Sequence, residues 1–322
     1  MISIVICHRD ELLLEELKQN IASSIGVVHE LIIVDNTRNE YNICAAYNEG
    51  VKRSSYPIVC FAHEDILFHT ENWGQKVVAH FDNEVVGMIG VLGGMAQSAI
   101  PAAWWYNTYY AYSATNLLMR KVYNDINSPL LLNYNNIYSE DKTEVVVIDG
   151  LWFCIRKCLF DNISFDKESF NGFHLYDADI SMQVRQLKRN FVIYDILIEH
   201  KWDSSISKNY YSFLEVFNEK WKNALPASAE RVPLNYLTRL SWHSLRMLLY
   251  EMKRSGFSRR ETALIKNKYY SRLQKKYPSF WFGLYFLCRA VLAERLCFAI
   301  FYRVEMLLGI NKDPGMEIRE FN

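Results

Sequence analysis

The sequence lacks both of the glycine-rich motifs that commonly bind phosphate groups. Neither G-x-G-x-x-G nor G-x-x-x-x-G-K-[ST] occurs, although the chain contains 13 glycines. The first motif marks dinucleotide-binding domains, and the second marks P-loop enzymes. The hypotheses of a dehydrogenase and of a P-loop NTPase therefore lose their main sequence evidence.

Features of secreted and membrane-spanning proteins are also missing. The seven cysteines are odd in number and irregularly spaced, which predicts free thiols in a reducing compartment. The chain starts directly with ISIVIC, without a basic region, a signal core or a cleavage site. Its most apolar late stretch, FWFGLYFLCRAVLAERLCFAIFY, is interrupted by Arg289, Glu294 and Arg295, which argues against a spanning helix. A cytoplasmic protein is expected.

Charge is balanced overall but divided unevenly along the 322 residues. Residues 1–200 contain 15 Lys and Arg against 25 Asp and Glu, whereas residues 201–322 contain 21 against 11. The length and the 50% hydrophobic content suffice for a full core with an appended subdomain. The uneven division of charge predicts an acidic catalytic body and a basic tail that binds to a surface.

Strand and helix patterns alternate over the first ninety residues. The strand-like runs ISIVIC, LIIV, PIVCFA and VVGMIGVLGG are separated by the helix-like segments DELLLEELKQNI, NICAAYNEGVKRS and ENWGQKVVAHF. This alternation predicts βαβ units and a parallel sheet. VVVIDG and LWFCIRKCLF continue the pattern, and FVIYDILIEH is expected to form one last strand that runs into His200.

Residues 95–144 interrupt this rhythm with a segment rich in Tyr, Trp and Asn. Long irregular loops in compact domains are usually lids or binding loops, and aromatic rings with polar edges can stack on sugars. The alternative is an inserted helix or hairpin that packs in the ordinary way.

Beyond residue 201 the pattern is helical. One predicted helix places a basic stripe opposite an apolar face, and Ser258 with Glu261 forms a capping-box signature for a second basic helix. We therefore predict a catalytic domain at 1–205 and a basic helical subdomain at 206–322, with residues 224–233 as the best candidate linker. The stripe consists of Arg239, His243, Arg246 and Lys253.

Acidic residues and histidines gather where the strand-like runs end. Asp35 follows LIIV, the triplet His63-Glu64-Asp65 follows PIVCFA, and His200 ends FVIYDILIEH. Open α/β sheets bind ligands at this edge, and carboxylates with an imidazole suit a divalent cation that carries phosphates. Taken singly, each Asp is explained equally well as a helix cap or the start of a turn.

The order and spacing of these segments resemble the family 2 glycosyltransferases with a GT-A fold, in particular a bacterial glycosyltransferase-like branch. The resemblance covers about residues 1–205 and implies a GT-A nucleotide-diphospho-sugar transferase-like mixed α/β sheet flanked by helices, here followed by C-terminal helices. It rests on SIVICHRD, LIIVDN, AAYNEGVKRS with PIVCFAHED, VVVIDGLWFCIRKCLF, FDKESFNGFHLYDADI and IEHKW.

The resemblance places the donor nucleotide at the ends of the first strands. Cys7, His8 and Asp35 are expected to contact the nucleotide, and Glu64, Asp149 and Gly150 are grouped with them as substrate-binding residues. The family's Asp-x-Asp metal motif falls on His63-Glu64-Asp65, where Asp65 matches the position that holds Mn²⁺ or Mg²⁺.

Two further histidines are candidates for the metal site. His63 replaces the first Asp of the motif, so it is either a second ligand or a packing residue, and metal dependence itself is open to question. His200 matches a late histidine that reaches the metal or the diphosphate, with a structural role as the alternative.

Asp177 matches the carboxylate that removes the proton from the attacking hydroxyl in inverting members. The family often has Glu-Asp here, whereas this chain has Tyr176-Asp177. Asp179 lies two residues further on and points in a different direction along a helix, so it is expected to support the substrate site or to cap the helix.

The sequence thus predicts a metal-assisted, inverting hexosyltransferase that uses a nucleotide-diphosphate sugar and a glycan or lipid-linked glycan acceptor. No nucleic-acid partner is expected. The basic helices are expected to contact the inner face of the plasma membrane, or else to pack on the catalytic domain or on a second subunit. A nucleotidyltransferase is the second enzyme hypothesis, and a catalytically silent glycan- or nucleotide-binding relative is the non-enzyme one.

Overall fold

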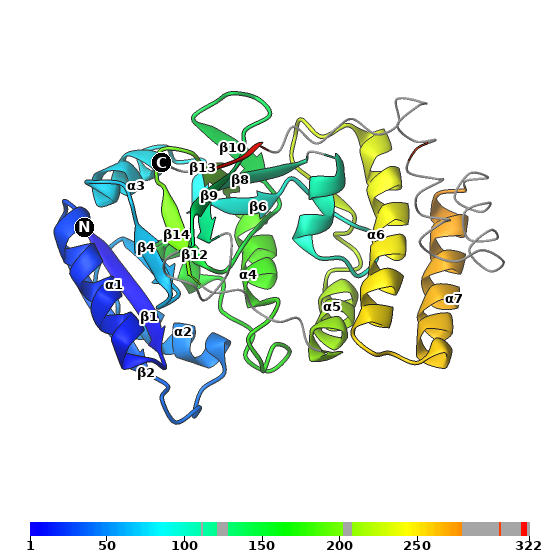
Figure 1. Ribbon diagram of the computed structural model, residues 1–322, viewed down its shortest axis with the longest axis horizontal. Coiled ribbons are helices and arrows are strands. Elements are labelled where there is room, and N and C mark those ends of the chain that lie inside the picture. The colour runs from blue at the N-terminus through cyan, green and yellow to red at the C-terminus, as the bar shows by residue number, and fades with distance from the viewer. Residues whose placement is uncertain (111, 121–127, 202–207, 279–302, 304–316, 321–322) are drawn as a thin grey trace.

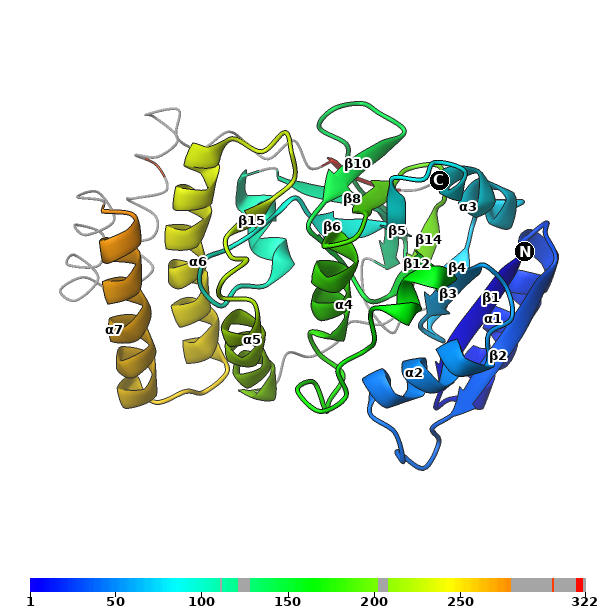
Figure 2. The same cartoon turned by 180° about the vertical axis from the view of Figure 1, so that it is seen from behind.

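The computed structural model of the protein describes residues 1–110, 112–120, 128–201, 208–278, 303 and 317–320. Figure 1 shows an α/β body that contains the N-terminus, with α6 and α7 at the opposite end of the molecule. Figure 2 shows from behind that α4 and α5 lie between the N-terminal strands and these two helices.

A seven-stranded mixed sheet forms the centre of the body, in the order β10-β13-β5-β12-β3-β1-β2. Strand β1 pairs in parallel with both β2 and β3, as the βαβ pattern predicts. Strand β12 runs antiparallel between β3 and β5, so the sheet is mixed beyond the first three strands. The strands are β1 (Ile2–His8), β2 (His29–Asp35), β3 (Ile58–Ala62), β5 (Val86–Gly90), β10 (Lys142–Val145), β12 (Trp152–Arg156) and β13 (Arg189–Ile193).

Helices cover both faces of this sheet because its inner strands are apolar on both sides. Val5 and Cys7 of β1 pack in the core on the side of α2 and α4, whereas Ile4 and Ile6 pack on the side of α1 and α3. Gly50 lets α2 approach β1, since a Cβ there would lie 2.2 Å from a methyl of Val5. The helices are α1 (Glu11–Ser24), α2 (Ile43–Arg53), α3 (Trp73–Phe81) and α4 (Tyr176–Arg185).

A second sheet lies beside the first, in the order β11-β6-β8-β14-β4, with β9 and β16 extending it beyond β8. Residues 95–144 contribute a 3-10 helix, η1 (Trp104–Tyr110), and the antiparallel pair β8 and β9, so much of this segment is regular structure and not a long irregular loop. Its strands are β4 (Ile66–Phe68), β6 (Leu92–Gly94), β8 (Ser113–Arg120), β9 (Leu130–Asn135), β11 (Val147–Ile148), β14 (Ile198–His200) and β16 (Glu317–Glu320).

The segment FVIYDILIEH is not the single strand that was expected. It forms β13 in the central sheet and β14 in the second sheet. The side-chain amide of Asn116 donates hydrogen bonds to the carbonyls of Tyr194 and Ile196, at 3.1 and 2.8 Å. These bonds satisfy the backbone where the chain leaves one sheet for the other, so the apolar run can break there.

In the part of the chain that the structure describes, three helices follow the body: α5 (Lys208–Lys220), α6 (Leu234–Arg254) and α7 (Arg259–Lys276). The capping box at Ser258 and Glu261 is confirmed, with both reciprocal hydrogen bonds present. Between α5 and α6, β15 (Ala227–Ser228) pairs with β7 (Ala96–Gln97) of the body. The division into domains at residue 205 remains a prediction.

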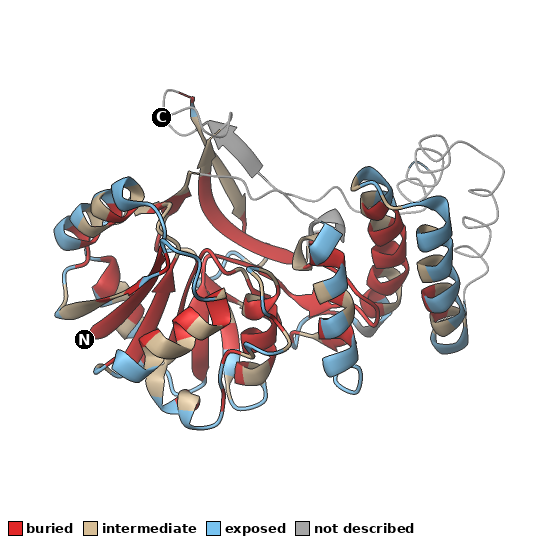
Figure 3. Ribbon diagram, turned by 90° about the horizontal axis from the view of Figure 1, so that it is seen from below, coloured by how far each residue is buried: buried red, intermediate tan, exposed pale blue. Residues whose placement is uncertain are grey.

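The basic stripe expected on α6 is wrong as a surface feature. His243 is 1% exposed and Arg246 is 2% exposed, whereas Lys253 is exposed. The physical reason is that α6 packs on both sides: Leu240 and Leu248 join the main core, and Leu245 joins the cluster shared with α7. Figure 3 shows α6 largely buried and α7 more exposed.

Among the described residues, no helix combines the length and apolarity that crossing a bilayer requires. The apolar stretch from residue 280 to residue 302, on which one sequence expectation depends, lies wholly outside the described residues.

Candidate active site

Strand pairing brings His63, Asp65 and His200 together at one edge of the body. His63 and Asp65 lie between β3 and β4, and the antiparallel pairing of β14 with β4 sets His200 opposite Ile66. His200 Nε2 lies 3.3 Å from one oxygen of Asp65, and His63 Nδ1 lies 3.9 Å from the other. One ligand atom from each residue falls within 4.8 Å of the others, which is a spacing that could hold a metal ion.

The protonation of His63 and Asp65 suits a cation. Burial lowers the pKa of His63, which favours the neutral imidazole that binds metals. Burial by itself raises the pKa of Asp65, but the hydrogen bond and charge of His200 outweigh it, so the net pKa lies below its usual value. A neutral imidazole and a carboxylate are ligands that Mn²⁺ accepts, and with His200 as a second imidazole the donor set fits a divalent ion.

A cleft opens beside the triad, between the end of β1, the start of α1 and the start of α2. Cys7 lies on its wall, where burial raises the pKa of the thiol to about 11 and leaves it protonated. Arg9 is the one cation among the lining residues, which are Cys7, Arg9, Asp10, Leu13, Ile43, Tyr47, Ala62, His63, Glu64, Asp65 and Phe173.

Three residues predicted to bind the nucleotide make contacts within the protein. Glu64 accepts hydrogen bonds from the backbone N–H groups of Arg9 and Asp10, and also lies 3.2 Å from the ring of His8. Asp35 is exposed, and its carboxylate accepts from the backbone and hydroxyl of Thr37. Glu64 and His8 thus brace the β1–α1 loop that borders the cleft, whereas Asp35 opens a turn and is not among the residues that line the cleft.

Asp177 lies in the first turn of α4 and lines a second cavity. Its carboxylate accepts a hydrogen bond from the backbone N–H of Gly150, at 3.0 Å. Burial, reinforced by the negative charge of Asp149, raises the pKa of Asp177 to about 7. Asp149 is itself held by a hydrogen bond from Trp104 Nε1, at 2.8 Å.

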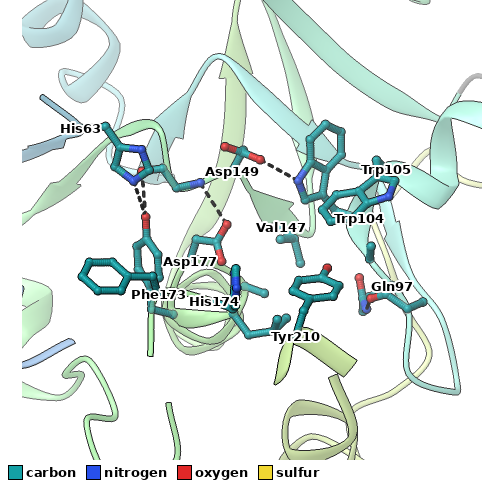
Figure 4. A pocket seen from close by; sticks show the side chains of 16 residues that line it. His63, Gln97, Trp104, Trp105, Val147, Asp149, Phe173, His174, Asp177 and Tyr210 are labelled. Atoms are coloured by element: carbon teal, nitrogen blue, oxygen red, sulfur yellow. Dashed lines mark hydrogen bonds between the residues drawn. The ribbon is translucent and has the colours of Figure 1, made fainter. Parts of the chain in front are cut away.

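This second cavity has aromatic walls drawn from segments far apart in the chain. Figure 4 shows Trp104, Trp105, Tyr210 and His174 around the space that Asp177 faces. Trp105 stacks on Tyr210 with ring centroids 5.6 Å apart, so η1 and α5 build one wall together. His63 and Phe173 line both this cavity and the cleft, which makes the two spaces neighbours.

Asp179 faces away from both spaces. Its carboxylate, 1% exposed, accepts hydrogen bonds from Lys220, Trp221 and Gln183 at 2.9, 2.8 and 2.8 Å. It therefore fastens α5 to α4, which agrees with the structural alternative raised for it.

The structure adds site residues that the sequence did not single out. Trp104 and Trp105 fall in the aromatic segment expected to meet sugars, but Phe173, His174 and Tyr210 carried no signal of their own. The nearest hint was the position of Phe173 and His174 directly before Asp177 in FHLYDAD.

The sequence model of the "Glycosyltransferase like family" matches residues 3–221, and the chain belongs to this family. The streptomycin biosynthesis protein StrF of Streptomyces griseus is 21% identical over 165 residues, which cover 49% of this chain and 52% of StrF. The match thus spans about half the length of that relative. Together with the mixed sheet and its flanking helices, the family confirms the GT-A-like α/β class predicted from sequence.

Two solved structures are more distantly similar. The match to GalNAc-T7, solved with UDP, GalNAc and Mn²⁺, has a TM-score of 0.44 and 11% identity, and covers 86% of this chain and 58% of that one. The match to A197 from STIV has a TM-score of 0.37 and 14% identity, and covers 63% of this chain and 86% of that one.

Proposed function

We propose that this protein transfers a hexose from a nucleotide-diphosphate sugar to an acceptor hydroxyl with inversion at the anomeric carbon. One observation carries the proposal. Asp177, a carboxylate whose pKa is raised to about 7, faces an aromatic cavity that shares His63 with a cleft bordered by a candidate metal triad. A base poised near neutral pH beside a leaving-group site is what direct displacement needs.

The donor would lie in the cleft between β1 and α2. Arg9 borders this cleft and offers a positive charge to the phosphates. His63, Asp65 and His200 would hold Mn²⁺ or Mg²⁺, which when bound would neutralise the diphosphate leaving group.

Asp177 would act on the acceptor. As the acceptor oxygen bonds to the anomeric carbon, the bond from that carbon to the diphosphate oxygen breaks, and the hydroxyl proton moves to the Asp177 carboxylate. Because displacement occurs in one step, no covalent sugar–enzyme intermediate forms and the configuration inverts. The N–H of Gly150 holds the carboxylate in place throughout.

The aromatic walls support an acceptor that is itself a sugar. Trp104, Trp105 and Tyr210 offer ring faces and polar edges, which suit the apolar and hydroxylated sides of a pyranose. A glycan and a lipid-linked glycan share this chemistry, so the acceptor class is proposed at that level.

The test separates donor binding from transfer. A thermal-shift panel of UDP-, GDP- and dTDP-sugars with Mn²⁺ identifies the donor, because a ligand at ~100 times its dissociation constant adds about 2.7 kcal/mol of stability. Asp177→Asn is then expected to bind this donor like the wild type, while product formation falls by about 10² to 10⁴-fold. The exposed Asp161, changed to Asn, is the matched control and keeps full activity.

Wild-type turnover by Asp177→Asn would reject Asp177 as the base. Donor binding without turnover in the wild type, across the panel and a set of glycan acceptors, would instead support the catalytically silent relative.

A further inference from the structure

The two positions at which this chain departs from the expected motifs touch each other. His63 stands where the metal motif has Asp, and Tyr176 stands where a Glu often precedes the base. His63 Nε2 lies 2.8 Å from Tyr176 Oη, and Tyr176 Oη lies 3.1 Å from the carbonyl oxygen of Gly150. Figure 4 draws the first of these bonds at His63, close to Asp177.

Counting protons in this chain of hydrogen bonds assigns the tautomer of His63. A carbonyl oxygen only accepts, so the single hydroxyl proton of Tyr176 goes to Gly150. Tyr176 Oη then accepts from His63, and the proton of the neutral ring sits on Nε2. Nδ1 keeps its lone pair, and it is the nitrogen nearer Asp65, 3.9 Å from the carboxylate.

The surroundings hold the Tyr176 side chain in this position. Its side chain is 4% exposed and packs edge-on against Tyr47. A Cβ at position 150 would lie 2.2 Å from Tyr176 Oη, so only glycine lets the hydroxyl reach this carbonyl. The same Gly150 donates its N–H to Asp177, and one peptide segment therefore supports both the histidine and the base.

We propose that Tyr176 is a positioning residue that fixes His63 with its Nδ1 lone pair toward Asp65 and His200, so that the triad binds a divalent cation. This inference depends on the proposed function in one respect, which is that His63, Asp65 and His200 form the metal site. Partners that orient a ligating histidine in this way typically contribute 10- to 100-fold to metal affinity.

The first experiment measures Mn²⁺ alone, from the free-ion signal in electron paramagnetic resonance. Tyr176→Phe is expected to weaken Mn²⁺ binding by about 10- to 100-fold while its melting temperature shows that it folds. The control is Tyr194→Phe, which also removes a half-buried hydroxyl with two hydrogen bonds, to Asn135 and Thr143, and keeps wild-type affinity.

A double-mutant cycle distinguishes positioning from general damage. In a His63→Asp background the ligand is a carboxylate without tautomers, so adding Tyr176→Phe is expected to leave Mn²⁺ affinity unchanged. An equal loss in both backgrounds would overturn the proposal.

A spectroscopic measurement needs no change at Tyr176. The ¹⁵N spectrum of the metal-free protein, with His63 assigned by comparison with His63→Asn, is expected to show the Nε2–H tautomer. The Nδ1–H tautomer would overturn the proposal.

These results are separable from failure of the proposed function. If His63→Ala and Asp65→Ala bind Mn²⁺ like the wild type, the triad is not a metal site and both ideas fail at that point. If Mn²⁺ affinity follows the cycle but no sugar is transferred, the role of Tyr176 stands and the transferase activity does not.

Discussion

At the scale of single residues, opposing effects determine the pKa of Asp177. The N–H groups of its own helical turn and of Gly150 favour the carboxylate, whereas burial and the charge of Asp149 favour the neutral acid. Burial is the largest contribution, so the net pKa rises to about 7. The cost of burying this charge should therefore appear in the stability of the protein as well as in its chemistry.

Asp177→Asn is accordingly expected to stabilise the fold at alkaline pH. With a pKa of about 7 in the folded state and about 3.9 in the unfolded state, wild-type stability from this group is full below about pH 4 and lost as pH rises toward 7. Asn carries no charge and accepts the same N–H. Differential scanning fluorimetry should show the variant melting above the wild type at pH 8, with a difference that shrinks at pH 4.5.

The same comparison on Asp161→Asn, an exposed carboxylate, should show no such pH-dependent gain. A melting temperature for Asp177→Asn that is lower than wild type at every pH would contradict the assigned cause of the raised pKa.

Some site residues could be predicted from sequence and others could not. Asp65 and His63 follow a recognisable buried strand, so their position at its end could be predicted. Tyr210 could not, because its approach to Trp105 depends on how α5 docks, which is set by contacts distant in sequence.

At the scale of elements, α5 is fastened to the body through one buried carboxylate. Lys220 binds Asp179 at 2.9 Å and Asp166 at 2.7 Å, and Trp221 donates to Asp179 as well. Because Tyr210 lies on this helix and lines the Asp177 cavity, the fastening also positions part of the site.

Lys220→Ala should lower the free energy of unfolding by about 1–3 kcal/mol, since it leaves the buried Asp179 without its charged donor. Urea denaturation provides the measurement. The control is Lys222→Ala, whose exposed i,i+3 pair with Glu219 should contribute less than ~0.5 kcal/mol. Equal losses in the two variants would mean that the Asp179 contact does not fasten α5.

Elements with local signals were predicted best. The α1 and α2 segments carry apolar stripes and the side-chain caps Asp10 and Asn42, so local sequence specifies them. The insertion of β12 between β3 and β5 depends on pairing across distant segments, which no local pattern encodes. The same limit explains why the polar stripe of α6 was wrongly predicted to be exposed. Its burial depends on packing against the main core and against α7.

At the scale of the whole molecule, the basic C-terminal half does not present its charge where the sequence indicated. His243 and Arg246 are buried in α6, but α7 exposes Arg259, Arg260 and Lys275. We therefore expect the membrane contact to be made by α7 and not by α6.

We predict that α7 brings the protein to anionic membranes by reversible electrostatic binding, near a lipid-linked acceptor. Each basic residue close to an anionic surface is worth ~1 kcal/mol, so changing Arg259, Arg260 and Lys275 to Gln should weaken binding by about 3 kcal/mol, or about two orders of magnitude. Flotation with anionic and neutral vesicles at low and high salt measures this, and Arg38, Lys52 and Lys167, exposed on the body, are the matched control set.

Binding should be selective for anionic vesicles and weakened by salt, because the charges on α7 are screened over about 10 Å at 0.1 M. Equal flotation with neutral vesicles, or equal losses in the two triple variants, would leave α7 a role in packing or self-association and remove the reason to expect a lipid-linked acceptor.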